Sequence, residues 1–189
     1  MFAQFMPALR MLVIMTTLTG VIYSLVVTGI SKVAFPRAST GSLIVSDGKT
    51  LGSDLIGQPF DDPKYFWSRP SATSPFADNA GSSSGSNLSP TNPDLVKAVQ
   101  GRVDALRAAD PGNMAPVPVD LVTASGSGLV PHISPAAAIY QVARVAKARK
   151  LDPEAVRQLV ERHIEGRSLG FLGEPRVNVL ALNLALDGK

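Results

Sequence analysis

The sequence predicts an α+β protein with one N-terminal transmembrane helix, over residues 11–35, followed by one small soluble domain, over residues 36–189. A run of 21 residues without a charged side chain predicts the transmembrane helix. Three later segments begin with a helix-capping residue before proline, and short apolar runs lie between turn residues. Residues 1–10 form a short segment ahead of the helix. The remaining length is sufficient for one domain with a modest core.

The charge-free run extends from Met11 to Ser31. A helix of that length spans about 30 Å, which matches the hydrocarbon thickness of a bilayer. A cleaved secretory signal has a shorter apolar core and a small-residue cleavage site, whereas Lys32, Phe35 and Pro36 follow here. A buried helix of a soluble protein usually carries a polar stripe, which this run lacks. The run is therefore predicted to stay in a membrane.

Small and weakly polar residues recur every four positions within this run, at Thr16, Gly20, Ser24 and Thr28. The spacing places them along one face of a helix. Close backbone approach over small residues, with hydroxyl hydrogen bonds, is what associates helices in lipid. Such residues are also common in membrane helices that have no partner. The pattern favours a helix that packs against another one.

The net charge of +3 comes wholly from Arg10, Lys32 and Arg37, which flank the apolar run. The rest of the chain is neutral and has no basic cluster interleaved with aromatic residues, so nucleic acid is not an expected partner. Membrane lipid is expected beside the helix. The flanking charges are too balanced for the positive-inside rule to decide the orientation. The absence of cysteine fits any compartment.

Between residues 41 and 67 the short apolar runs Ser42–Val45 and Leu55–Ile56, with a turn at Asp47-Gly48, predict a strand hairpin. Residues 68–93 hold eight Ser, four Pro and three Asn, a composition that is typical of a flexible linker. Large side chains such as Trp67, Arg69 and Phe76 lie in or beside this Ser/Pro/Asn-rich loop. They are unusual for a simple spacer and favour a loop that folds against a partner.

Three helices are predicted by the same start signal, an N-cap residue followed by proline at the first helical position. The starts are Asn92-Pro93, Ser134-Pro135 and Asp152-Pro153. The apolar stripes are Leu95, Val99, Val103 and Leu106 in the first, Ile139, Val142 and Val145 in the second, and Val156, Leu159, Val160 and Ile164 in the third. Their ends are predicted at residues 110–112, at the basic residues 147–150, and at Gly166. Strands are expected over residues 117–124 and 177–180.

Motifs for catalysis are sparse. The chain has no P-loop and no dinucleotide-binding glycine fingerprint. Ser127 lies between two glycines, but Ser125 occupies the place where a nucleophile elbow needs its first glycine. His132 is close in sequence, so a membrane-anchored serine hydrolase that uses Ser127 and His132 stays as the alternative function. With two His, no Cys and no clustered acids, no metal site is expected, and the sequence identifies no cofactor-binding residues.

Several longer segments carry a family resemblance, in an order that runs from the membrane helix to the carboxyl end. The segments are Tyr65-Phe66-Trp67-Ser68-Arg69-Pro70-Ser71-Ala72, Gly85-Ser86-Asn87-Leu88, Pro116-Val117-Pro118-Val119-Asp120, Ser125-Gly126-Ser127-Gly128-Leu129, Pro131-His132-Ile133-Ser134-Pro135, Gln141-Val142-Ala143-Arg144-Val145-Ala146 and Gly173-Glu174-Pro175-Arg176-Val177-Asn178-Val179-Leu180. Together they resemble the KdpC subunits of bacterial Kdp potassium-transporting ATPases.

The resemblance implies a non-catalytic accessory subunit of a high-affinity, ATP-driven potassium uptake complex in the bacterial plasma membrane, where it crosses the membrane once. The implied partners are the channel-like potassium-translocating subunit, the P-type ATPase subunit and a small single-helix subunit. It also places the soluble domain outside the cytoplasm. A role in assembly is implied, and so is a higher ATP affinity of the ATPase subunit, with ATP bound only jointly with that subunit.

The motifs further indicate four residues for contacts with partner subunits, namely Arg69, Asn87, Asp120 and His132. Any one of them could instead be a loop residue with its bonds satisfied within the chain. One position departs from the family pattern, because Val130 stands where similar proteins carry an aspartate. A valine side chain accepts no hydrogen bond, so an ionic role for this loop cannot be carried over.

Overall fold

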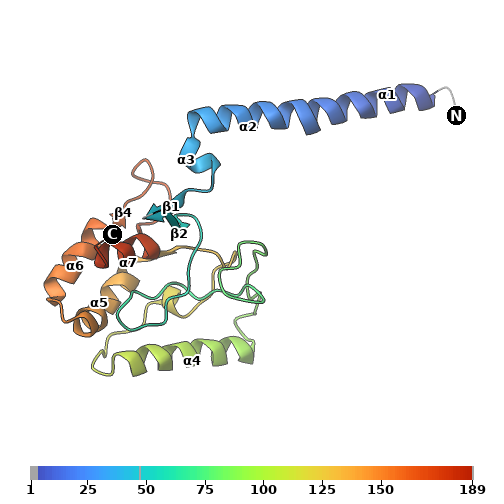
Figure 1. Ribbon diagram of the computed structural model, residues 1–189. Coiled ribbons are helices and arrows are strands. Elements are labelled where there is room, and N and C mark those ends of the chain that lie inside the picture. The colour runs from blue at the N-terminus through green and yellow to red at the C-terminus, as the bar shows by residue number, and fades with distance from the viewer. Residues whose placement is uncertain (1–3, 47, 189) are drawn as a thin grey trace. The chain divides into compact units, whose positions relative to one another are not determined.

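A computed structural model describes residues 4–46 and 48–188 of the chain. The chain divides into two compact units, one up to Leu43 and one from Ile44 onward. Helices and two small sheets make up the elements, so the α+β class is confirmed. Figure 1 labels the elements, and each unit is described by itself.

The N-terminal unit is dominated by one continuous helix from Phe5 to Ala34, which is long and apolar enough to cross a membrane. It comprises α1 (Phe5–Met15), a π-helical stretch (Thr16–Ile22) and α2 (Tyr23–Ala34). The helix therefore begins six residues before the charge-free run does and includes Arg10. A short helix, α3 (Pro36–Ser39), follows. The outward-facing apolar side chains are exposed along the whole length, as a lipid-facing helix requires.

The unit from Ile44 onward is called the soluble unit below. The predicted hairpin is present where the two units join, as β1 (Leu43–Ser46) and β2 (Lys49–Ser53), which form a two-stranded sheet. In the predicted turn, Asp47 lies outside the described residues, and Gly48 has φ of +71°, which suits glycine. The second predicted run, Leu55–Ile56, is not a strand. Its Ile56 makes only an isolated bridge to Ser53.

The three predicted helices are present as α4 (Pro93–Ala109), α5 (Pro135–Arg149) and α6 (Pro153–Arg162), each with the expected N-cap. The predicted end of α6 at Gly166 is wrong. The helix stops at Arg162, where the ring of His163 bonds the carbonyl of Leu159 through Nδ1 at 2.8 Å. Ile164 leaves the helix because it pairs with Val177 in a sheet.

The predicted strand over residues 117–124 is wrong. The segment forms a 3₁₀ turn, Val119–Leu121, and its consecutive residues Leu121 and Val122 are both buried. Strand residues would alternate in burial, and Pro118 lacks the N–H that a ladder needs. The hydroxyl of Thr123 donates to the carbonyl of Val119 at 2.8 Å and stabilises the turn.

A second sheet has three short antiparallel strands in the order β3 (His132–Ile133), β5 (Arg176–Asn178) and β4 (Ile164–Glu165). His132 pairs with Asn178, and Glu165 pairs with Arg176. The prediction of a strand over 177–180 is correct only at its start, because α7 (Val179–Leu186) begins immediately after β5. The side chain of Asn178 accepts the N–H of Ala181 and caps this helix.

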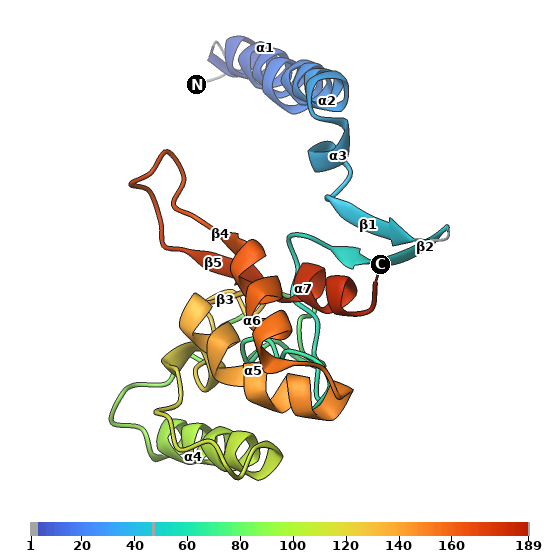
Figure 2. The ribbon, with the colours of Figure 1, turned by 90° about the vertical axis from the view of Figure 1, so that its left-hand side faces the viewer.

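The core of the soluble unit lies among α5, α6, α7 and the three-stranded sheet. Phe66 is its largest fully buried side chain, although it comes from an irregular segment. Helix α4 lies apart from the other helices in both views (Figures 1 and 2) and contributes Leu106 as its one buried side chain. Through Phe66, the irregular segment that precedes α4 is therefore anchored in the core, against α5 and α7.

Candidate functional site

Two buried side-chain amides hold the extended segment around Phe66 and Trp67. Asn183 of α7 accepts the N–H of Phe66 at 2.9 Å and donates to the carbonyl of the same residue at 3.0 Å. Gln141 of α5 does the same for Trp67, at 2.8 and 3.2 Å. Each amide satisfies one donor and one acceptor of a backbone that has no strand beside it. These residues therefore take the place of a neighbouring strand.

Arg144 of α5 completes this clamp. Its guanidinium donates to the carbonyls of Pro63 and Tyr65, at 2.6 and 3.1 Å, and to the amide oxygen of Gln141. It also lies over the ring of Trp67, with 4.4 Å from the guanidinium carbon to the ring centroid. Burial lowers the pKa of Arg144 to about 10, so the side chain still carries its charge at neutral pH.

The Ser/Pro/Asn-rich loop, residues 68–93, forms no helix or strand before Pro93, where α4 begins, and it is bonded to the loop at residues 123–130. Arg69 donates from Nε to the carbonyl of Thr123 at 3.0 Å, and Ser71 donates to Gly128 at 2.7 Å. The N–H of Ser84 reaches the carbonyl of Ser127 at 3.0 Å. The composition predicted a flexible linker, whereas these bonds attach the loop to the chain's own soluble unit.

Three of the four residues predicted to contact partners line one shallow groove of about 320 Å³. These are Arg69, Asp120 and His132. The other lining residues are Val119, Ile133, Ser134, Glu174, Pro175 and Arg176. Asn87 does not line this groove; it is exposed in the Ser/Pro/Asn-rich loop with φ of +51°. The groove brings together residues that lie up to about a hundred positions apart.

Two of these residues have partners that give them a structural role in the groove. Asp120 accepts the N–H of Ser134 at 2.6 Å and its hydroxyl at 3.2 Å, and Ser134 in turn caps α5 by accepting the N–H of Ala137. Both guanidinium contacts of Arg69 go to carbonyls, including that of Ala124 at 3.3 Å. These two side chains therefore fix the wall of the groove.

His132 lines the groove from β3, an outer strand of the three-stranded sheet. Its Nε2 is 4.0 Å from a carboxylate oxygen of Glu165, which also accepts a bond from Arg176 at 2.9 Å. Burial, and secondarily the charge of Arg176, lower the pKa of His132, against the opposing effects of Glu165 and Asp54. The imidazole is consequently neutral at pH 7. It can give or take one hydrogen bond toward a partner without carrying charge.

The pair required by the hydrolase alternative is not assembled in the described residues. The hydroxyl of Ser127 lies 3.4 Å from that of Ser125 and accepts the N–H of Leu129 at 3.2 Å. Ser127 does not line the groove that contains His132, and no hydrogen bond joins the two side chains in that part of the chain. Within residues 4–46 and 48–188, no three His, Asp or Glu side chains gather to hold a metal ion.

The clamp residues Gln141, Arg144 and Asn183 were not predicted as important. A signal was present for the first two, because they are polar residues in phase with the buried positions of α5: Gln141 lies one turn before Val145, and Arg144 lies one turn after Gln141. Glu165 and Arg176 were also missed. Their pairing depends on the register of β4 and β5, which are too short to show a strand pattern.

The residues predicted for helix packing cross a change of helix type. Thr16 and Gly20 lie in the π-helical stretch, whereas Ser24 and Thr28 lie in α2. Ser24 donates weakly to the carbonyl of Thr19, at 3.5 Å. The space next to Gly20 is open, because a β-carbon at this position would meet no atom within 4 Å beyond the backbone of its own helix.

Comparison with known proteins identifies relatives over nearly the whole chain. The family described as KdpC, the c chain of the K+-transporting ATPase, matches residues 5–188. A potassium-transporting ATPase KdpC subunit from Methylococcus capsulatus is 66% identical over 187 residues, which cover 99% of this chain and 98% of the relative. The KdpC subunit of Sorangium cellulosum is 63% identical over 188 residues, covering 100% and 99%. The chain therefore belongs to the KdpC family.

Proposed function

We propose that this chain is the membrane-anchored accessory subunit of a K+-transporting ATPase and that it stabilises the assembled complex. The match to the KdpC family from residue 5 to residue 188 carries the proposal, together with the single apolar helix. Its partners are the channel-like potassium-translocating subunit, the P-type ATPase subunit and a small single-helix subunit. The protein crosses the bacterial plasma membrane once, with its soluble unit outside the cytoplasm.

The helix from Phe5 to Ala34 joins the complex through the small-residue face at Thr16, Gly20, Ser24 and Thr28. Four residues make slightly more than one turn of an α-helix. They make less than one turn of a π-helix, in which the hydrogen bonds run to the fifth residue. A residue four positions on is therefore rotated slightly past the first one in an α-helix and slightly short of it in a π-helix. Because these two rotations have opposite signs, the change from π-helix to α-helix at Tyr23 supports a face on which all four residues stay aligned. A partner helix can approach closely along it.

The soluble unit supports the potassium entrance and does not coordinate the ion. Its groove faces the potassium-translocating subunit. Arg69 and Asp120 keep the groove in shape through their bonds to the chain's own backbone. The exposed rim, at Val119, Glu174 and Arg176, supplies the contacts to the partner. The neutral His132 forms one further hydrogen bond there.

The experiment that tests the proposal compares two substitutions in the same helix. Gly20→Leu places a bulky side chain on the small-residue face, whereas Gly29→Leu makes the same change off that face, and both positions have open space beside them. Gly20→Leu should reduce recovery of the other subunits by about tenfold when tagged protein is purified from detergent-solubilised membranes, a loss of about 1.4 kcal/mol. Gly29→Leu should leave the recovery unchanged.

The same samples separate an assembly role from an effect on ATP. With Gly20→Leu, the potassium-dependent ATPase activity should fall in proportion to the complex recovered, with an unchanged KM for ATP. Normal recovery of the complex with Gly20→Leu would contradict helix packing over this face. A raised KM for ATP at full recovery would instead favour a direct effect on nucleotide binding. If no other subunit co-purifies with the unsubstituted chain, the proposed function itself fails.

A further inference from the structure

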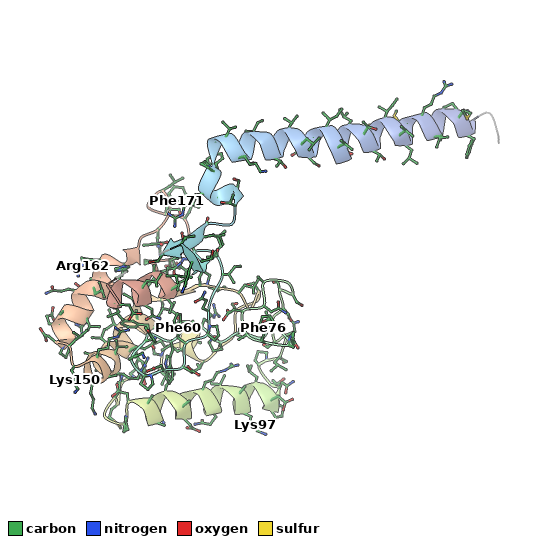
Figure 3. All side chains as sticks on the ribbon, in the orientation of Figure 1. Phe60, Phe76, Lys97, Lys150, Arg162 and Phe171 are labelled. Carbon is green, nitrogen blue, oxygen red and sulfur yellow. The ribbon has the colours of Figure 1, made fainter. Side chains whose placement is uncertain are left out.

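The hairpin between β4 and β5 ends in three exposed apolar side chains. Leu169 is 83% exposed, Phe171 68% and Leu172 50%. Ser168 and Leu172 exchange two backbone hydrogen bonds of 2.9 Å, which close the hairpin below its end. We call Leu169, Phe171 and Leu172 the apolar tip. Figure 3 shows Phe171 at the opposite end of the soluble unit from α4, which carries Lys97.

The backbone of the apolar tip is held in an unfavourable conformation. Leu169 has φ of +54°, in the left-handed region that bulky residues rarely adopt. Glycine adopts this conformation readily, and the next residue, Gly170, does so with φ of +82°. A leucine here is strained and gains little burial within the chain, and such a combination favours a contact of its side chain outside the soluble unit.

The charges around the hairpin are paired. Arg167 lies 2.7 Å from Glu174, and Arg176 lies 2.9 Å from Glu165. The hairpin therefore presents apolar surface without a net charge. A surface that recognised an anionic or cationic partner would leave one sign in excess. The expected interaction is apolar and only weakly dependent on salt.

The apolar tip lies at the end of the soluble unit at which the chain from the apolar helix enters. Nine residues separate Ala34 from Ile44, and even fully extended they reach only about 30 Å. In both views β1, which starts the soluble unit, and the β4–β5 hairpin lie at the same end of that unit, away from α4 (Figures 1 and 2). The end of the soluble unit that carries the tip is thus the end tied to the membrane helix.

We propose that the apolar tip inserts into the interfacial layer of the lipid bilayer and forms a second contact with the membrane. Phenylalanine and leucine are the side chains that amphipathic anchors bury at the boundary of headgroups and acyl chains. A stable protein interface buries about 800 Å² on each partner. Three side chains on a convex turn supply less than this, since even an aromatic residue buries only about 150–250 Å². Fluid lipid adapts to such a shape.

The experiment uses the absence of cysteine from the chain. Phe171→Cys in the full-length chain is labelled with an environment-sensitive fluorophore and reconstituted into phosphatidylcholine vesicles that contain doxyl-labelled lipid. Met114→Cys serves as the matched control, because Met114 is 91% exposed. Quenching by the doxyl lipid should be about threefold or more stronger at position 171 than at position 114, and it should persist in high salt. Equal quenching at the two positions would overturn the proposal.

A second substitution separates insertion from the folding of the hairpin. Leu169→Gly relieves the backbone strain while it removes an apolar side chain. Added to the labelled Phe171→Cys chain, it should lower the quenching without lowering the thermal stability. Unchanged quenching would contradict insertion. If the label in the assembled complex is protected from a water-soluble quencher but is not quenched by doxyl lipid, the tip contacts a protein partner, and the proposed insertion into lipid is contradicted.

The inference relies on the proposed function only for the membrane anchor, and a carbonate wash of the vesicles tests that part separately. If the wash removes the chain, the anchor and the proposed function fail. If the chain stays in the vesicles and position 171 is quenched no more than position 114, the inference about the tip fails alone.

Discussion

Helices α4 and α5 begin with the same local chemistry but contribute differently to the fold. Each has a polar N-cap that accepts a backbone N–H, followed by proline at the first helical position. Helix α5 buries seven side chains, including Gln141 and Arg144. Helix α4, which is two residues longer, buries Leu106 alone among its residues. Local signals decide that a helix forms, whereas distant segments decide how much of it is buried.

The two helices also use their arginines differently. Arg144 of α5 bonds the backbone of the segment before Phe66, about 80 residues away, and lies against Trp67. Arg102 of α4 donates a single 2.8 Å bond, to the carbonyl of Val122. Buried polar groups without partners are costly, so Arg144 and the segment that precedes Phe66 each depend on the other being folded. The bonds of α5 therefore couple the folding of that segment to the folding of the helix. Helix α4 contributes Leu106 to the core, with Val99 and Val103 packed against it, so loosening of α4 exposes less of the core than loosening of α5 would.

The largest expected effect comes from Arg144→Ala. The substitution removes the guanidinium donor from the carbonyls of Pro63 and Tyr65 and one of the two donors to the amide oxygen of Gln141, which keeps the N–H of Trp67. It also removes the packing on Trp67. The free energy of unfolding should fall by about 3–5 kcal/mol, since each buried group left unpaired costs about 1–3 kcal/mol. Urea denaturation in mild detergent, followed by circular dichroism, measures the loss.

Lys97→Ala is the matched control for this prediction, because it removes an exposed cation from α4. A change within about 0.5 kcal/mol is expected for an exposed site of this kind. Arg144→Lys should lie between the two, since lysine keeps the charge but loses the planar set of donors. Equal losses for Arg144→Ala and Lys97→Ala would remove the distinction between the helices.

The second prediction compares the N-cap residues Ser134 of α5 and Asn92 of α4, which begin helices that differ in the number of side chains they bury. Ser134→Ala removes the acceptor for Ala137 and a hydroxyl bonded to Asp120, so the global free energy of unfolding should fall by about 1–2 kcal/mol. Asn92→Ala removes the acceptor for Asp94, but fraying confined to the first turn of α4 leaves Leu106, near the other end of the helix, in the core. Its global effect should stay below about 0.5 kcal/mol.

Native-state hydrogen exchange distinguishes the two outcomes of this second prediction. With Asn92→Ala, faster exchange should be confined to the first turns of α4. With Ser134→Ala, protection should fall across α5 and the core strands together. If Asn92→Ala lowered protection throughout the soluble unit, α4 would have to be counted as part of the cooperative core.

The contrast between the helices also explains how far the sequence could predict the fold. Capping residues, proline and periodic apolar positions act within a few residues, so the three helix starts are correct. The bonds from Asn183 to Phe66 span 117 positions, and no local pattern encodes them. The error at residues 117–124 has the same origin. An apolar run is compatible with a strand, but Pro118 and the use of Asp120 as an acceptor for Ser134 favour a turn.

The candidate groove was predictable in part for a related reason. Arg69, Asp120 and His132 were identified from motifs, yet their assembly into one surface depends on α5 starting directly after β3. Asn87 belongs to a similar motif but does not line the groove, and it is exposed in the Ser/Pro/Asn-rich loop. Glu165 and Arg176, which set the electrostatics around His132, come from strands of two and three residues that carry no period-two signal.

The smallest expected effect is a dependence of stability on pH that comes from His132, which lies two residues before the N-cap of α5. Because its pKa is lowered in the folded protein, the unfolded chain binds the proton more readily. The contribution of His132 is therefore fully present above the unfolded pKa of about 6.5 and is lost as the pH falls from there toward the folded pKa. Urea denaturation between about pH 7 and 5 should show this decline, and His132→Asn should flatten it. Exchange protection in α5 should follow the same decline, with α4 unaffected, because β3 leads directly into α5. If the decline is unaltered in His132→Asn, the pH dependence comes from other titratable groups. Helices α5 and α4 would then not differ in their link to the titration of His132.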